Sequence, residues 1–355
     1  MPQFFHRFRR RQKDQDATST DLPLILSKTG IDYDTCNSNA SLRDYRDYTA
    51  MPLPPPRRPL TPPPESADPE ESPGAVNTQT QSALFVRLPR NIRERIYIEL
   101  FGERAVHVEY DYGFAPGYRG REKKPPDQWR WWHRVCEEEE AKPGDMCRSD
   151  DLDDLKRKGK RELLKYKLKG VEWLRTCRIG YQEALPILYG TNTFLVASAV
   201  KLCRFPKVIV PSHLTAITSL DILHIAKATT PSTMSDDDWS MYNTIFRTLR
   251  LSYTGLQCLR LVIYILNKPC TPRAGSVPEE FEEAWFRPWQ DLASSRTWEK
   301  LEIGIQASWF KDFSESAERW AKRIGQAEPG YTLVQVEDYT TWDGKLSEVW
   351  NAPYL

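Results

Sequence analysis

The sequence predicts an α/β protein, with a mixed α+β arrangement as the alternative, and three observations lead to that class. Two amphipathic helical segments stand near residues 84–102 and 170–190. Four apolar runs typical of β-strands follow in the C-terminal half of the chain, and helix-like stretches separate them. Strands separated by helices are expected to pair in parallel, because a parallel connection needs a crossover of a dozen or more residues.

The composition limits the classes to which this protein can belong. The chain has 355 residues, of which 40% are hydrophobic, which is enough for one large domain or two smaller ones. Lys and Arg total 50 against 49 Asp and Glu, so net charge gives no support for nucleic-acid binding. The seven cysteines form no CxxC pair, as expected of reduced thiols. The longest apolar run, 261–266, is far shorter than the ~18 residues of a membrane span. We expect a cytoplasmic or nuclear protein that does not enter membranes.

Residues 1–80 are predicted to be a disordered tail, because ten prolines between Met51 and Pro73 accompany few apolar side chains. Pro52–Arg57 has the spacing of a polyproline II ligand, a pattern that also recurs by chance in proline-rich linkers. The basic N-terminus, with Phe4, Phe5 and Phe8 among arginines, is either a targeting or surface-binding segment or a solvated tail.

An ordered domain is expected over residues 81–355. Its first part, 81–110, holds a helix that Pro89 opens in the first turn, followed by a strand from Ala105 to Tyr110. Ile92 and Ile96 recur at helical spacing, with Tyr97 at the edge of the apolar stripe. Gly102 is placed to end this helix in a left-handed cap.

Residues 111–169 are predicted to be a charged insertion, acidic from Glu137 to Asp154 and basic from Lys156 to Lys169. The next part, 170–196, holds a second helix and a strand over Asn192–Val196. Pro186 should break or kink that helix, since proline removes a backbone hydrogen bond inside it.

Residues 197–355 are predicted to form a degenerate strand–helix array. The expected strands cover Ile217–Ile225, Leu256–Leu266, Trp298–Ile305 and Tyr331–Val336. The expected helices cover about Asp236–Leu251, Glu279–Ala293 and Ser314–Ile324. The strands begin 39, 42 and 33 residues apart, which favours a leucine-rich-repeat-like solenoid or an ordinary α/β sheet. Trp285, Trp289, Trp298 and Trp309 are interpreted first as packing residues.

The segment Leu84–Phe101, with Leu-Pro-Arg-Asn-Ile-Arg-Glu-Arg-Ile-Tyr at 88–97, resembles the opening of an uncharacterised fungal family, a domain of unknown function. The segment Trp173–Phe194 resembles the second signature of the same family. Both segments also resemble a split F-box. That resemblance implies docking on a Skp-type adaptor of a ubiquitin ligase through Leu88, Pro89, Ile92 and Ile96. Asn91 replaces the usual acidic residue, and a long insertion replaces a short loop. Packing of Leu88, Ile92 and Ile96 in the chain's own core is favoured over docking, because apolar helical stripes are usually buried.

Enzyme motifs are not found in the sequence, and no cofactor is expected. His133 and Cys136, three apart on an expected helix, with Cys147 beyond and His107 or Cys177 to complete the set, are the nearest approach to a zinc site. Because the spacing matches no standard finger, no metal is predicted. Cys177 is interpreted as a buried thiol.

The sequence therefore predicts a non-enzymatic protein-interaction protein, with substrate adaptor of a ubiquitin ligase as the specific hypothesis. A scaffold or regulatory module recruited through the proline-rich tail is the alternative, and a zinc-binding protein is the third.

Overall fold

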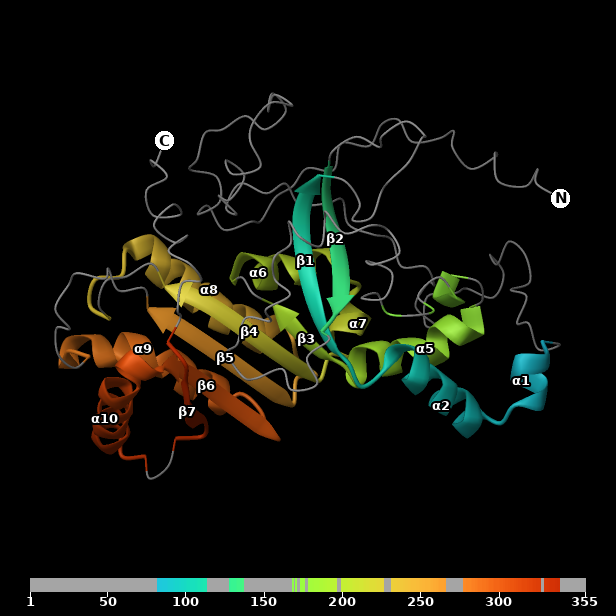
Figure 1. Cartoon of the computed structure of the whole chain (residues 1–355). Coiled ribbons are helices and arrows are strands. Elements are labelled where there is room, and N and C mark those ends of the chain that lie inside the picture. The colour runs from blue at the N-terminus through green and yellow to red at the C-terminus, as the bar shows by residue number, and fades with distance from the viewer. Residues whose placement is uncertain are drawn as a thin grey trace, which may run out of the picture. The chain divides into compact units, whose positions relative to one another are not determined.

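Six of the seven strands in the sheet run parallel, and they follow one another across it in chain order. The structure is a computed structural model (Figure 1). It describes residues 82–113, 128–136, 168, 170, 173–175, 178–196, 199–226, 231–265, 277–326 and 329–338. These residues all belong to one compact unit, Leu53–Leu355. The proline-rich tail and most of the charged insertion lie outside the described residues.

The elements in the first half of the described chain are helices, a hairpin and a short strand. They are α1 (Ala83–Arg87), α2 (Arg90–Phe101), β1 (Ala105–Gly113), β2 (Gln128–Val135), the 3-10 helix η6 (Trp173–Arg175), α5 (Arg178–Gly190) and β3 (Thr193–Val196). Helices and strands then alternate. They are α6 (Ala199–Val208), α7 (Pro211–Leu214), β4 (Ser219–Ala226), α8 (Asp236–Ser252), β5 (Cys258–Ile265), α9 (Glu279–Ala293), β6 (Lys300–Gln306), α10 (Ala307–Arg323) and β7 (Thr332–Val336).

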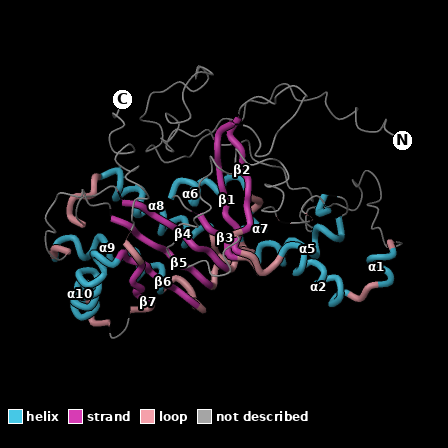
Figure 2. The backbone as a smooth tube through the Cα atoms, in the orientation of Figure 1, coloured by secondary structure: helices cyan, strands magenta, loops and turns pink. Residues whose placement is uncertain are grey.

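The sheet has the strand order β2-β1-β3-β4-β5-β6-β7, and β2 pairs antiparallel with β1. Each new parallel strand is added on the same side of the one before it (Figure 2). When crossovers share one hand and always advance in one direction, their helices fall on one face of the sheet. The burial pattern agrees, because β4 alternates buried and half-buried residues along its whole length.

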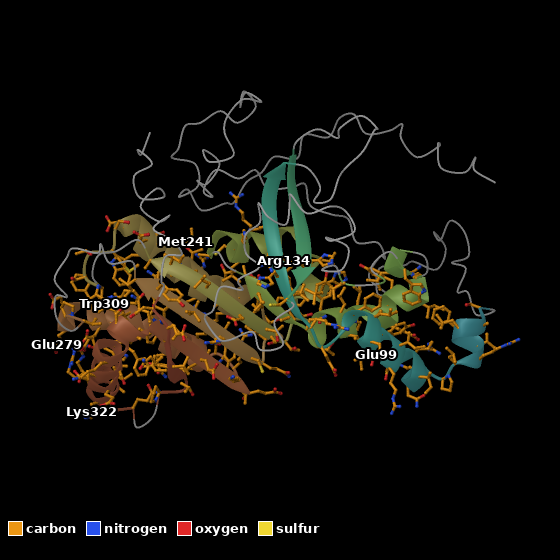
Figure 3. All side chains as sticks on the ribbon, in the orientation of Figure 1. Glu99, Arg134, Met241, Glu279, Trp309 and Lys322 are labelled. Carbon is orange, nitrogen blue, oxygen red and sulfur yellow. The ribbon has the colours of Figure 1, made fainter. Side chains whose placement is uncertain are left out.

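The main core lies between that face of the sheet and helices α6, α8, α9 and α10. Strand residues such as Ile222, Leu261 and Ile303 pack there with helix residues, including Phe313 of α10. Aromatic side chains fill the C-terminal part of this core, where Trp285, Trp289 and Trp309 are at most 1% exposed (Figure 3 labels Trp309). Aromatic rings combine a large apolar surface with a polar handle that needs a partner. Trp285 satisfies its indole N–H by donating to the carbonyl of Pro231 at 3.1 Å.

The predicted α/β class is confirmed, and the predicted strand–helix array is its C-terminal half. Strands β4 to β7 begin and end within two residues of the positions expected from the sequence. Helices α8 and α9 begin where the sequence places them. Ser235 caps α8 through its hydroxyl, which accepts from the amide of Asp238 at 3.1 Å. Trp285, Trp289 and Trp309 are core residues as interpreted, and Trp298 is partly buried against the core.

Residues 129–136 are not helical, contrary to expectation. All but Cys136 belong to β2, which forms an antiparallel hairpin with β1, so that Val106 faces Val135 and His107 faces Arg134. The tertiary pairing with β1 decides the conformation, since β-type aromatic and branched residues favour a pleated surface.

The second helix is not broken at Pro186, which lies inside α5. Pro186 and Gln182, whose carbonyl loses its partner there, are both exposed, so water can satisfy that carbonyl. Gly102 does not adopt a left-handed conformation, since its φ is −96°, and the left-handed position falls on Glu103 at φ 53°. Among the described residues, no helix is long and apolar enough to cross a bilayer.

Candidate interaction surface

Helix α2 packs on η6 and α5, which brings the two signature segments of the sequence together. Tyr97 and Phe101 of α2 are at most 1% exposed and form a small separate core with Leu174 and Ala184. The Trp173 ring lies 5.4 Å from Tyr97 and 6.5 Å from Phe101, measured between ring centroids. We call this group the α2–α5 core.

Gly180 of α5 leaves the space that the Trp173 ring of η6 occupies. A Cβ atom at position 180 would lie 2.1 Å from the indole ring, far inside van der Waals contact. A side chain there would therefore push Trp173 off the helix, and with it the ring that covers Tyr97 and Phe101. The glycine is needed for close approach, a role distinct from backbone flexibility.

An ion pair joins the two helices at the edge of this core. Arg93 donates to Glu183 through Nε at 2.8 Å and through a terminal nitrogen at 2.5 Å, a bidentate pair. Tyr97 donates its hydroxyl to the same carboxylate at 3.0 Å. These hydrogen bonds, from Arg93 first, lower the pKa of Glu183, and the same pairing raises the pKa of Arg93. The pair is 11% and 17% exposed, so solvent weakens it little.

Arg93 also orders the chain that leads into α2. Its other terminal nitrogen donates to the carbonyl of Leu88 at 2.6 Å, and its guanidinium lies 5.4 Å from the ring of Phe85 on α1. One guanidinium therefore contacts α1, the Leu-Pro dipeptide and α5. Sequence reasoning missed Arg93 and Glu183. Their signal was an arginine and a glutamate inside the two signatures, each able to pair with the other.

Asn192 ties the ends of α2 and α5 to the sheet. Its amide nitrogen donates to the carbonyls of Phe101 at 2.5 Å and Leu188 at 2.6 Å. Its side-chain oxygen accepts from the amide of Arg104 at 2.9 Å, just before β1 begins. The side chain is fully buried, and it satisfies C-terminal carbonyls that a helix leaves without partners.

The predicted docking residues lie on the outside of this arrangement. Ile92 is 37% exposed and Ile96 is 36% exposed, so neither is a core residue. Leu88 is half-buried, and Pro89 is exposed at the N-cap of α2. The buried face of α2 instead carries Tyr97 and Phe101, rotated from the stripe that the isoleucine spacing suggested.

Val86 extends the exposed apolar surface onto α1, where it is 64% exposed. Helix α1 contains no buried residue although four of its five residues are apolar. Among the described residues, five large hydrophobic side chains are exposed: Val86, Ile92, Ile96, Leu251 and Ile324. Three of these belong to α1 and α2, and Ile92 and Ile96 lie one helical turn apart on α2. We call Val86, Ile92 and Ile96 the α1–α2 apolar surface.

His133 and Cys136 do not form the helical face expected of a metal site. His133 lies on β2 and Cys136 lies just after its end, and His133 accepts a 3.4 Å hydrogen bond from the amide of Leu168 through Nε2. Cys147 and Cys177 lie outside the described residues. Within the described ranges, no group of three or more His, Cys, Asp or Glu could hold a metal ion.

A cavity of about 370 Å³ lies between α8 and α9, lined by charged and apolar side chains. Its charges largely pair with one another, as Arg287 does with Glu283 at 2.6 Å and Arg250 with Asp291 at 3.8 Å. The cavity is a solvent-exposed junction between two helices whose charged groups pair with one another. We therefore do not treat it as a second candidate functional site.

Comparison with known proteins identifies one family. The family model of a domain of unknown function, DUF7730, matches residues 77–326. The match includes both signature segments and the sheet as far as α10. The chain matches no curated protein and no solved structure.

Proposed function

We propose that this chain, which belongs to the DUF7730 family of domains of unknown function, is a non-enzymatic protein-interaction protein that docks a partner on its α1–α2 apolar surface. The observation that carries the proposal is the exposure of Ile92 and Ile96 on a helix that buries Tyr97 and Phe101 on its other side. Burying these side chains against a partner would remove apolar area from water at about 25 cal/mol per Å².

The surface is held in a fixed place, which favours recognition over nonspecific contact. Arg93 connects α1, Leu88 and α5, so the exposed isoleucines stand on a helix with little freedom to move. Preorganised surfaces bind more tightly because less conformational entropy is lost on association. Charged side chains around the surface, such as the exposed Arg90–Glu94 pair, would form a solvated rim.

The partner we propose is a Skp-type adaptor of a ubiquitin ligase. The likeness of Leu88–Tyr97 to the opening of an F-box supports this choice, together with the exposure of its apolar residues. The packing of α2 on α5 supports a helical module assembled from two distant segments. In that case the sheet and its helices would present the substrate.

The test is binding of the full chain to a purified Skp-type adaptor, measured by calorimetry. The variant Ile92→Asp/Ile96→Asp should weaken binding tenfold or more, equivalent to about 1.4 kcal/mol or more. Leu251→Asp/Ile324→Asp is the matched control, since Leu251 and Ile324 are 60% and 43% exposed outside α1 and α2 and should not affect binding. Circular dichroism of each variant verifies folding.

Two results would count against the proposal. Absence of binding by the full chain would exclude the adaptor as partner. Equal affinity of wild type and the Ile92/Ile96 variant would exclude the surface. The alternative is then a scaffold recruited through the proline-rich tail. In that case, Pro52→Ala/Pro55→Ala should abolish binding to an immobilised domain that recognises polyproline II helices.

A further inference from the structure

The sheet has an apolar cluster on the face away from its helices. Alternate residues of a strand point to opposite faces, so Leu223 of β4 faces away from the core that holds Ile222. Leu223 and Ile225 pack there against a separate group of buried residues, namely Val262, Tyr264 and Val336. We call these five residues the outer-face cluster.

Three members of this cluster are buried more deeply than an open sheet face permits. Val262 is 1% exposed, Tyr264 is 2% exposed and Val336 is 4% exposed. Helices α6, α8, α9 and α10 pack on the opposite face, so they do not provide this cover. Val336 also lies on β7, an edge strand, with a neighbouring strand on one side only.

Packing within the sheet accounts for part of the burial. Gly304 on β6 lies between the two valines, and a Cβ there would meet Val262 at 3.0 Å and Val336 at 3.1 Å. The side chains therefore close over the glycine from both sides. This packing covers their flanks, and the side turned away from the sheet still needs a covering segment.

The cluster ends at a row of charged residues on the same face. Asp221, Arg260 and Glu302 stand in register on β4, β5 and β6, and Arg260 lies 3.8 Å from each carboxylate. These charged residues occupy the amino-terminal half of the strands on this face. The apolar area is therefore confined to the carboxyl-terminal half. The chain leaves β7 at that same edge of the sheet.

We propose that the C-terminal segment, residues 339–355, packs across the outer-face cluster. Asp338 fixes where this segment begins, because its carboxylate accepts from the amide of Ser308 at 2.8 Å, at the carboxyl-terminal edge of the sheet where α10 starts. That hydrogen bond fixes the chain two residues after Val336, itself a member of the cluster. The segment therefore begins beside the surface that needs a cover.

The composition of the segment fits the role. Apolar side chains recur three or four residues apart at Tyr339, Trp342, Leu346 and Val349, which predicts one apolar face. From β7 to β4 the sheet measures three strand spacings, or about 14 Å. A helix of the 17 residues from 339 to 355 would be about 25 Å long, so the segment is long enough in any conformation.

The experiment adds a peptide of residues 339–355 to the chain shortened to residues 1–338. The shortened chain should bind more of a dye for exposed apolar surface than the full chain, and the peptide should bind saturably and displace the dye. The Trp342→Asp/Leu346→Asp peptide should bind at least tenfold more weakly. The Thr340→Asp/Ser347→Asp peptide, with the same added charge, should bind like the original.

A second measurement uses the full chain and does not depend on the shortened chain folding. Trypsin should cleave after Lys345 slowly in wild type and at least tenfold faster in the Trp342→Asp/Val349→Asp variant, whose changes stand away from the cleaved bond, with the Thr340→Asp/Thr341→Asp variant unchanged. Equal cleavage rates in all three proteins, or a shortened chain that binds neither extra dye nor peptide, would overturn the proposal. Another segment would then cover the cluster.

Discussion

His224 shows how one buried side chain can make the whole fold sensitive to pH. It lies on β4 with 5% of its surface exposed, and its ring centroid is 6.4 Å from that of Tyr242. Among the described residues its Nε2 has no hydrogen-bond partner. Burial lowers the pKa of His224 from 6.5 to about 4, because a charged imidazole would lose its hydration there.

The stability of the protein should therefore fall as the pH is lowered from about 6.5 to about 4. In that window the unfolded chain binds a proton at position 224 and the folded chain does not, so unfolding is favoured. A pKa difference of about 2.5 corresponds to on the order of 3 kcal/mol once both values have been passed. Urea unfolding at a series of pH values measures the change.

The variant His224→Leu isolates this contribution. Burial also lowers the pKa of His213, so part of the pH dependence should remain in the variant. The difference between the pH dependence of stability in the wild type and in the variant is the contribution of His224. Two parallel curves between pH 4 and 6.5 would show that His224 is protonated in the folded protein or already exposed.

At the scale of elements, the attachment of α2 to α5 depends on polar contacts as well as on packing. Glu183→Gln keeps the size of the side chain and removes its charge, so it leaves the largely buried Arg93 without a counter-ion. We expect a loss on the order of 3 kcal/mol in the free energy of unfolding, the usual cost of removing one partner from a buried pair. Denaturant unfolding followed by circular dichroism measures it.

A matched control lies on the same helix. Arg90 and Glu94 form a pair of similar length, 2.9 Å, but their side chains are 75% and 44% exposed. Glu94→Gln should change the free energy of unfolding by about 0.5 kcal/mol or less, since solvent screens exposed pairs. Equal effects of the two substitutions would show that the Arg93–Glu183 pair contributes no more than a surface pair.

At the scale of the whole molecule, stability should decrease from the sheet toward α1. The core residues of β5 are almost fully buried on both faces of the sheet, whereas α1 has no buried residue. Backbone amides of β5 should exchange with solvent at least ~100-fold more slowly than those of α1. Hydrogen exchange followed by mass spectrometry measures this gradient. Amides of α1 as slow as those of β5 would mean that something covers α1 in the free protein.

The sequence predicted the array of strands and helices because each strand there is an apolar run between polar turns. Strand β5 is the clearest case, since almost its whole length is buried. Helix α6 was missed, although Ala199, Leu202 and Phe205 recur at the helical spacing of three. The hairpin strand β2 was taken for a helix from the three-residue spacing of His133 and Cys136, although Trp129, Trp131 and Val135 follow the period of two of a strand.

The sequence pointed to the docking residues, but it could not predict that Ile92 and Ile96 would be exposed. Ile92 and Ile96 have the spacing of a core stripe, and only the position of α5 shows that the buried side of α2 carries Tyr97 and Phe101 instead. The Arg93–Glu183 pair joins residues 90 positions apart, so no local pattern reveals it. Family membership agrees with the signatures but carries no role for any residue.

The long separation between Arg93 and Glu183 has a consequence for synthesis of the protein. A ribosome adds about 5–20 residues per second, so the 90 positions between them take on the order of 10 s to make. Throughout that interval the nascent chain carries Tyr97 and Phe101 with the helix that will cover them still untranslated. The βα units that follow are more local and can close soon after they emerge. The first helix of the signature therefore waits longer for its partner than the helices of the later units do, and it is a natural target for a chaperone during translation.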